Sequence, residues 1–130
     1  MAGSKSNYLE NKVLDDLYGS GDPTSIYVAL YTVAPSDAGG GTEVTGTNYS
    51  RKAVTNNDTN FPDAVDGVKT NGAAFTYSQA GSNWGSIVAM ATFDAADGNF
   101  LHWATLTNAR TIFTGDTFSF GPGDINISED

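Results

Sequence analysis

The sequence predicts a mainly β fold: an antiparallel β-sandwich or barrel, jelly-roll-like, of about seven or eight short strands with one N-terminal α-helix. Two observations carry this prediction. Turn signals rich in Gly, Asp and Asn recur along the chain at intervals of roughly eight to twelve residues. After a first helical segment, apolar residues alternate with a period of two. The 130 residues suit a single domain, 1–130, with a docking helix at 7–18 and a β body at 25–127.

The composition excludes several classes of protein. Six Lys and Arg against 15 Asp and Glu give a formal net charge of −9, which disfavours contact with a nucleic-acid backbone. The chain has no cysteine and one histidine, so disulfides, thiolate chemistry and multi-histidine metal centres are excluded. Its apolar runs are far shorter than the ~20 residues that span a membrane. We therefore expect no nucleic-acid, membrane or cofactor partner.

One amphipathic helix is predicted over residues 7–18. Asn7 is a suitable N-cap, and Glu10 completes a pair resembling a capping box. Gly19 stands where a glycine commonly ends a helix. A helix this short is marginal alone, so we expect it to dock on its own sheet or on a neighbouring subunit. Apolar residues recur at helical spacing along its predicted docking side: Leu9, Val13, Leu14, Leu17 and Tyr18.

The first predicted strand, 25–33, is apolar on both faces, as in a strand that is covered on both sides. The loop 34–48 follows it. Its run Gly39-Gly40-Gly41 indicates a loop that is mobile or closely packed against a partner. A second strand is predicted at 49–55, followed by an irregular stretch at 56–66.

The later strands are predicted as hairpins around turn signals. Asn-Gly supplies the positive φ angles of a type I′ turn. A glycine in a short connection can adopt the positive φ that the connection requires. The predicted pairs are 68–70 with 73–77 around Asn71-Gly72, and 86–93 with 99–106 around 94–98. Segments 111–113 and 117–120 flank a second tight turn at Gly115-Asp116. A terminal strand, 125–127, follows a turn at 121–124.

No catalytic or metal-binding constellation is predicted. His102 alternates with Phe100 and Ala104 on one strand face without a triad motif, so we expect a structural or interface role for it. Asp94 and Asp97 precede a glycine, but their spacing departs from that of an EF-hand loop. Turn capping explains this pair best, and calcium binding of another type is left open.

Aromatic side chains at alternating strand positions indicate a core or a subunit interface in preference to a sugar-stacking platform. Arg51 belongs to the single basic pair, which suits a salt bridge or an acidic patch on another copy. The helix and the loop 34–48 are expected to contact neighbouring subunits. The predicted interface residues are Tyr8, Leu9, Val13, Leu17, Tyr31, Arg51, Trp84 and Trp103.

The order of several segments resembles a family of small virion structural proteins of tailed bacteriophages and prophages, often labelled as tail-fibre proteins. The resemblance covers nearly the whole chain and brings no catalytic residue with it. It rests on Ser6–Asp15, Tyr27–Thr32, Gly40–Val44, Asn48–Arg51, Asn83-Trp84-Gly85, Phe93-Asp94-Ala95, Leu101-His102-Trp103 and Gly115–Phe120.

This resemblance implies a non-enzymatic component of the virion, assembled in the host cytoplasm. A compact acidic module with a clamping helix favours a capsid decoration (cement) protein bound across neighbouring capsid subunits. The alternatives are a tail-fibre or baseplate component, or a receptor- or carbohydrate-binding module. The expected partners are other virion proteins (the major capsid protein or tail proteins) and copies of the chain itself, with a trimer as one candidate homo-oligomer.

Overall fold

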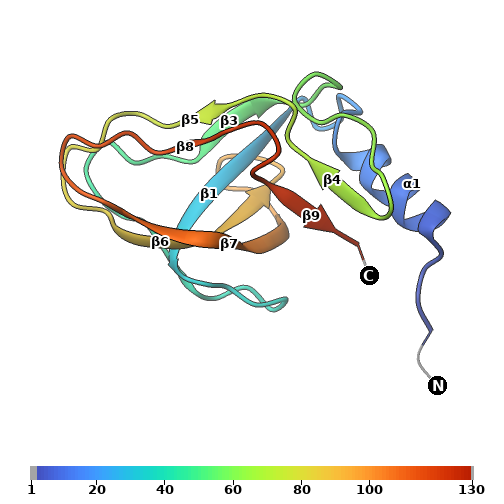
Figure 1. Ribbon diagram of the computed structural model, residues 1–130, viewed down its shortest axis with the longest axis horizontal. Coiled ribbons are helices and arrows are strands. Elements are labelled where there is room, and N and C mark those ends of the chain that lie inside the picture. Colours follow the sequence, from blue (N-terminus) through green and yellow to red (C-terminus); the bar gives the residue numbers. More distant parts are fainter. Residues whose placement is uncertain (1–2, 130) are drawn as a thin grey trace.

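The computed structural model describes residues 3–129 and is mainly β, as predicted (Figure 1). One helix near the N-terminus precedes a set of antiparallel strands in a sandwich-like arrangement. The elements are α1 (Asn7–Leu17), β1 (Ser25–Val33), β2 (Thr42–Glu43), β3 (Lys52–Thr55), β4 (Val68–Thr70), β5 (Phe75–Thr76), β6 (Gly85–Phe93), β7 (Phe100–Ile112), β8 (Ser119–Phe120) and β9 (Asn126–Ser128).

Helix α1 is close to its predicted range, but its cap differs. Ser6 is the N-cap, and its hydroxyl oxygen accepts a hydrogen bond from the Leu9 N–H at 3.2 Å. The predicted cap at Asn7 is therefore wrong, because Asn7 is already helical. Tyr18 is the C-cap in an extended conformation. Gly19 follows with φ +90°, and a Cβ there would lie 2.7 Å from a backbone oxygen, so this position requires glycine.

The principal sheet has the order β2-β1-β6-β7, and β3 also pairs with β1. Strand β1 runs through the middle of the molecule, and β7 forms one edge of the sheet (Figure 1). All the pairings are antiparallel. The predicted hairpin of β6 and β7 is confirmed, and Asp94 and Asn99 close its connection through a backbone hydrogen bond of 3.2 Å.

The predicted hairpin around Asn71-Gly72 is wrong, whereas the tight turn at Gly115-Asp116 is present, since the Asp116 N–H donates to the Phe113 carbonyl at 3.0 Å. Strand β4 pairs with β9, and β5 pairs with β8, so neither the strands around Asn71 nor those around Gly115 pair with each other. Asn71 is buried, and its side chain bonds the backbone of three residues instead of forming an exposed turn. Its amide donates to the carbonyls of Ala73 and Gly121, and its oxygen accepts from the Ile125 N–H, at 2.9 Å each. This cross-link favours β4–β9 pairing.

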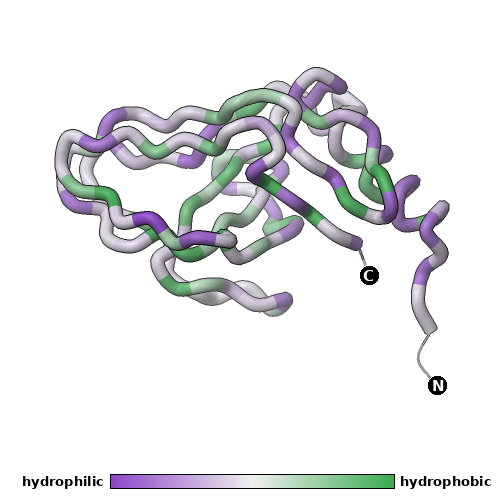
Figure 2. Tube along the Cα trace, viewed as in Figure 1, coloured by the Kyte–Doolittle hydropathy of each residue, from purple (hydrophilic) through white to green (hydrophobic). Residues whose placement is uncertain are grey.

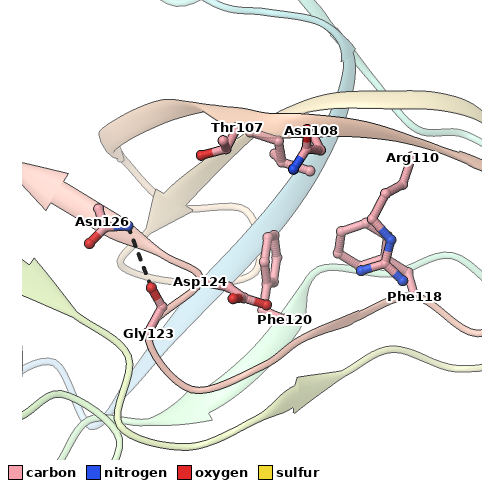
Figure 3. A pocket seen from close by; sticks show the side chains of 9 residues that line it. Thr107, Asn108, Arg110, Phe118, Phe120, Gly123, Asp124 and Asn126 are labelled. Atoms are coloured by element: carbon pink, nitrogen blue, oxygen red, sulfur yellow. Dashed lines mark hydrogen bonds between the residues drawn. The ribbon is translucent and has the colours of Figure 1, made fainter.

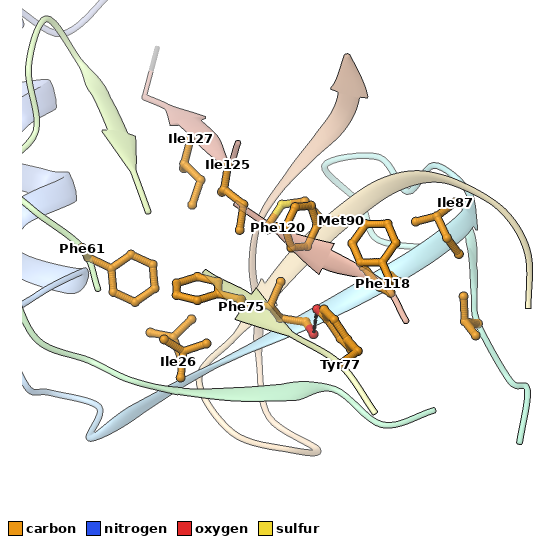
Figure 4. Packing of buried hydrophobic residues seen from close by; sticks show 14 of the residues in the cluster. Ile26, Phe61, Phe75, Tyr77, Ile87, Met90, Phe118, Phe120, Ile125 and Ile127 are labelled. Atoms are coloured by element: carbon orange, nitrogen blue, oxygen red, sulfur yellow. Dashed lines mark hydrogen bonds between the residues drawn. The ribbon is translucent and has the colours of Figure 1, made fainter. Parts of the chain in front are cut away.

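The apolar residues form two clusters on opposite faces of the principal sheet. The larger cluster fills the space between this sheet and the β4–β9 and β5–β8 pairs, where aromatic rings meet edge to face (Figure 4). The smaller cluster is built around alanines on the outer face and is covered by aromatic side chains. Apolar residues follow β1 through the molecule, whereas the N-terminal segment before α1 is hydrophilic (Figure 2).

Helix α1 is part of the larger core. Leu14 and Tyr18 are fully buried in it. Asp15 accepts a hydrogen bond of 2.8 Å from Lys69, whose side chain is only 1% exposed, and another from the Ala64 N–H. The helix lies against β4 at one end of the molecule (Figure 1). No helix within residues 3–129 is long and apolar enough to cross a membrane.

Candidate interaction surfaces

The four predicted interface residues of α1 differ in exposure. Tyr8 is 76% exposed and Leu9 is 43% exposed. Val13 and Leu17 are partly buried, and Leu17 packs against the main core. The helix therefore docks on its own body through one side. The other side presents two apolar side chains to solvent near its N-terminus.

Two of the predicted aromatic residues belong to the outer face of the principal sheet. Tyr31 is buried in the smaller cluster, and Trp103 packs against that cluster while remaining partly exposed. The Trp103 indole N–H donates to the Asp37 carboxylate at 3.0 Å, which ties the glycine-containing loop to the sheet. Burial raises the pKa of the Tyr31 hydroxyl. These contacts order the loop 34–48 within a single chain.

Trp84 belongs to the opposite, inner face. It is buried in the main core, where its indole N–H donates to the Thr47 carbonyl at 3.0 Å and its ring meets Tyr49 edge to face. A sugar-stacking platform would need its aromatic rings on one surface. The sheet instead separates Trp84, Tyr49 and Tyr77 from Tyr31 and Trp103.

Arg51 forms an internal salt bridge. Its guanidinium bonds both carboxylate oxygens of Glu43, at 3.0 and 2.9 Å, and the Ala96 carbonyl at 2.7 Å. It also lies over the Phe93 ring at 3.6 Å. The bond to Glu43 holds the pKa of Arg51 above its ordinary value. Arg51 thereby joins the β2 region to the β6–β7 connection. Of the two roles predicted for Arg51, a salt bridge or contact with an acidic patch on another copy, the structure contains the salt bridge.

His102 joins both ends of the chain to the sheet. Its Nδ1 atom lies 2.8 Å from the Tyr18 hydroxyl, and its Nε2 atom lies 3.0 Å from the Glu129 carboxylate. The Tyr18 hydroxyl also bonds Thr92 at 2.7 Å, and Lys5 bonds Glu129 at 3.1 Å. Both imidazole nitrogens are thus occupied by structural partners.

This network shifts the protonation of its buried members. Burial raises the pKa of Tyr18, so its hydroxyl stays neutral and provides one hydrogen to the network. Partial burial would raise the pKa of Glu129, but hydrogen bonds from His102 and Lys5 outweigh it and hold the pKa below its usual value. The arrangement therefore suits attachment of the terminal segments.

Asp94 caps a turn, as expected. Its carboxylate accepts from the Asn99 N–H at 2.7 Å and from the Asn99 side-chain amide at 3.0 Å, and these bonds lower its pKa. Within residues 3–129, no group of three or more His, Asp or Glu side chains is arranged to hold a metal ion.

A pocket that the sequence analysis missed lies beside the edge strand β7. In the β6–β7 ladder Ile87 faces Arg110 and Ala89 faces Thr105, so one residue of β6 stands opposite the four residues 106–109. Such bulges bend a strand and re-aim its side chains, often next to functional sites. This bulge directs residues 106–108 toward the segment that carries β8 and the start of β9 (Figure 3).

The pocket has a volume of about 250 Å3, and a smaller cavity of about 100 Å3 shares part of its lining. Phe118 and Phe120 are buried core residues beneath it, and the Arg110 guanidinium covers the Phe118 ring at 4.5 Å from the ring centre (Figure 3). Polar side chains complete the rim: Thr107, Asn108, Arg110, Asp124 and Asn126.

Several polar groups of this rim remain available for a ligand. Thr107 and Asn108 are exposed, and neither side chain makes a hydrogen bond within residues 3–129. One oxygen of Asp124 accepts from the Gly121 N–H at 2.7 Å, which leaves the other oxygen free of that bond. Arg110 donates to the Ser119 carbonyl at 2.8 Å and keeps further N–H groups. The one sequence signal was the polar gap between the predicted strands 99–106 and 111–113.

The fold is that of a small β-rich protein with one N-terminal helix. A sequence model of one protein family, described as podophage GP4 fiber I protein gp80, matches residues 4–128. The chain belongs to this family and is a structural component of the phage virion. The family resemblance found in the sequence is thereby confirmed. A search of curated proteins finds no match to the chain.

Proposed function

We propose that this protein is a non-enzymatic subunit of a phage tail fibre, which acts by assembling with other virion proteins and with copies of itself. The observation that carries the proposal is the match of a fibre-protein family to residues 4–128. That match favours the tail-fibre alternative over the capsid decoration protein expected from the sequence. The family gives decoration no specific support.

The contacts of His102 support a non-enzymatic role. A general base needs a ring nitrogen that can reach a substrate proton. In this chain one nitrogen faces the buried Tyr18 hydroxyl, and the other faces Glu129. The imidazole is therefore engaged in holding the fold together, which is consistent with a protein that works through contacts.

Exposed apolar side chains support assembly through α1. If another subunit covered Tyr8 and Leu9, their apolar surface would be removed from water, and this burial would stabilise the contact. Repeated contacts of this kind favour a symmetric oligomer, with a trimer as one candidate. Size-exclusion chromatography with light scattering would test this oligomer by comparing the molar mass of the parent chain with that of the variant Tyr8→Ser/Leu9→Ser. The matched control is Lys12→Ser, which alters an exposed residue of the same helix.

Labelling of intact particles tests the location. Gold-labelled antibody raised against the recombinant chain should bind at the tail, with parallel detection of the protein in a denatured-virion blot. Label spread over the head would overturn the tail-fibre proposal and favour decoration. Absence from both intact and denatured particles would contradict a virion role altogether.

A further inference from the structure

We propose that copies of this chain associate head to tail, with Phe113 of one copy packed against Tyr8 and Leu9 of the next. We call α1 and the segment 63–67 beside it the helix end, and the β7–β8 connection with the loops that it contacts the strand end. The inference rests on the proposed function, since it assumes self-assembly through α1 and names the surface of the second copy that covers it.

Exposed apolar side chains mark the helix end. Within residues 3–129 five large apolar side chains are exposed, and three of them are Tyr8, Leu9 and Val65. Val65 is 67% exposed and lies two residues before Gly67, whose N–H donates to the Asn11 side chain of α1 at 2.7 Å. The three side chains therefore belong to one end of the molecule.

The other two exposed apolar side chains mark the strand end. Phe113 is 58% exposed in the β7–β8 connection, and Val33 is 56% exposed at the end of β1. Val33 follows Thr32, whose side chain lies 3.6 Å from the position of a Cβ at Gly85. Gly85 faces Ile112, the neighbour of Phe113, in the β6–β7 ladder. Both exposed side chains thus belong to the strand end.

The helix end and the strand end lie at opposite extremes of the long axis. In Figure 1 α1 lies at the right, and the β7–β8 connection reaches the left. A contact between different ends is heterologous, so each copy keeps one free end after binding. Ends at opposite extremes favour an open array along the long axis over a small closed ring.

The strand end presents Phe113 from a fixed backbone. The Phe113 N–H donates to the Asp116 carboxylate at 2.9 Å, and the Asp116 N–H donates back to the Phe113 carbonyl at 3.0 Å. The Gly115 N–H donates to the Ala80 carbonyl at 2.8 Å, which ties the connection to a neighbouring loop. A ring held in this way loses little conformational freedom on binding. Buried aromatic side chains are common anchors of protein interfaces.

Charge favours the head-to-tail contact over contact between two helix ends. Asp63 and Asp66 are exposed beside α1 and form no ion pair within residues 3–129. Two helix ends placed together would bring such carboxylates near one another, and they would repel. The loops of the strand end are uncharged over residues 44–50, 78–86 and 111–115. Contact between two strand ends would leave the apolar side chains of both helix ends in water, whereas head-to-tail contact covers both groups.

Sedimentation velocity of the full chain over a range of concentrations tests the contact. Phe113→Ser removes the anchor of the strand end, and Tyr8→Ser/Leu9→Ser removes that of the helix end. Each variant should self-associate at least about tenfold more weakly than the parent chain, because apolar contact area is lost. The substituted side chains are exposed, so both variants should keep the fold.

An equimolar mixture of the two variants identifies the head-to-tail arrangement. Each variant retains the end that the other lacks, so the mixture should form pairs of one copy of each and nothing larger. The control Thr107→Val alters an exposed residue in the middle of β7 and should associate as the parent chain does. A mixture that stays monomeric overturns the proposal, and so does a Phe113→Ser chain that associates as strongly as the parent.

The same measurements separate this contact from the proposed function. If association persists in Phe113→Ser but is lost in Tyr8→Ser/Leu9→Ser, self-assembly through α1 stands and the head-to-tail contact is overturned. If the parent chain stays monomeric at every concentration, the contact is overturned, and labelling of particles still decides the tail-fibre role.

Discussion

Two regions of this molecule treat their polar side chains in opposite ways. At the helix end, Asp15 pairs with the buried Lys69, and His102 joins the helix to the C-terminal strand. At the β7 rim, Thr107 and Asn108 face solvent and make no hydrogen bond within residues 3–129. Among those same residues, every buried side-chain nitrogen or oxygen has a hydrogen-bond partner.

The difference follows from the cost of burying polar groups. A buried polar group without a partner destabilises the fold, whereas an exposed one loses nothing by remaining free. The polar groups of the helix end are therefore paired within the fold, whereas those of the β7 rim remain in solvent. For the same reason, a chain that lacks residues 1–18 is expected to lose its stable fold. Removing α1 would open the main core and leave Lys69 without its partner.

The largest expected effect distinguishes the inner and outer sides of α1. Leu14→Ala should destabilise the protein by about 2–5 kcal/mol, since Leu14 is fully buried and the change leaves a cavity. Leu9→Ala, on the outer side, should alter stability by about 0.5 kcal/mol or less. Urea denaturation of both variants provides the measurement. Similar losses for the two would contradict the described orientation of the helix.

A second test addresses the pairing of Lys69. Asp15→Asn should destabilise the fold by about 1–3 kcal/mol, because a lysine that is 1% exposed loses its counter-charge. The double variant Asp15→Asn/Lys69→Met should recover much of that loss, since it no longer buries an unpaired charge. Urea denaturation of the two variants measures both effects. If the double variant is less stable than Asp15→Asn, the ion pair is not the source of the cost.

The sequence predicted the elements with strong local patterns. The helix, β1 and the β6–β7 hairpin follow from periodicity and turn chemistry and are confirmed. The predicted end of β7 at 106 is wrong, because the strand runs to Ile112 and includes most of the separate strand predicted at 111–113. The pairings of β4 with β9 and β5 with β8 were missed. They depend on a buried Asn71 that contacts residues about 50 positions away, and local pattern carries no such information.

The candidate surfaces also differ in how far the sequence could predict them. The exposure of Tyr8 follows from its place on a helical face, but the burial of Trp84 does not follow from strand alternation alone. Alternation assigns residues to two faces without saying which face is covered. The β7 pocket was missed because its bulge is a mismatch between two strands. Neither strand shows that mismatch by itself.

Acidification should weaken the contacts at the helix end. The hydrogen bonds to Glu129 hold its pKa below the usual value of 4.5, so it binds fewer protons folded than unfolded. Its contribution to stability is present above pH 4.5 and is lost as pH falls through the lowered folded pKa. Asp15 acts in the same direction, because its bonds to Lys69 and Ala64 outweigh partial burial and lower its pKa.

Thermal unfolding between pH 7 and pH 3 measures this contribution. Glu129→Gln should reduce the acid-induced fall in melting temperature relative to the parent chain. Asp97→Asn serves as a control, since Asp97 is exposed in the β6–β7 connection. An unchanged pH profile for Glu129→Gln would show that the link from His102 to the C-terminal segment adds nothing to stability.

The smallest expected effect sharpens the contrast at the β7 rim. Thr107→Val/Asn108→Ala should alter the free energy of unfolding by about 0.5 kcal/mol or less, as both residues are exposed and lack hydrogen bonds within residues 3–129. Arg110→Ala should cost more, because it removes the bond to Ser119 and the contact with Phe118. Urea denaturation ranks the two changes. A large loss for the first would mean that the bulge side chains support the fold, and the contrast between a paired helix end and a solvent-exposed rim would then fail.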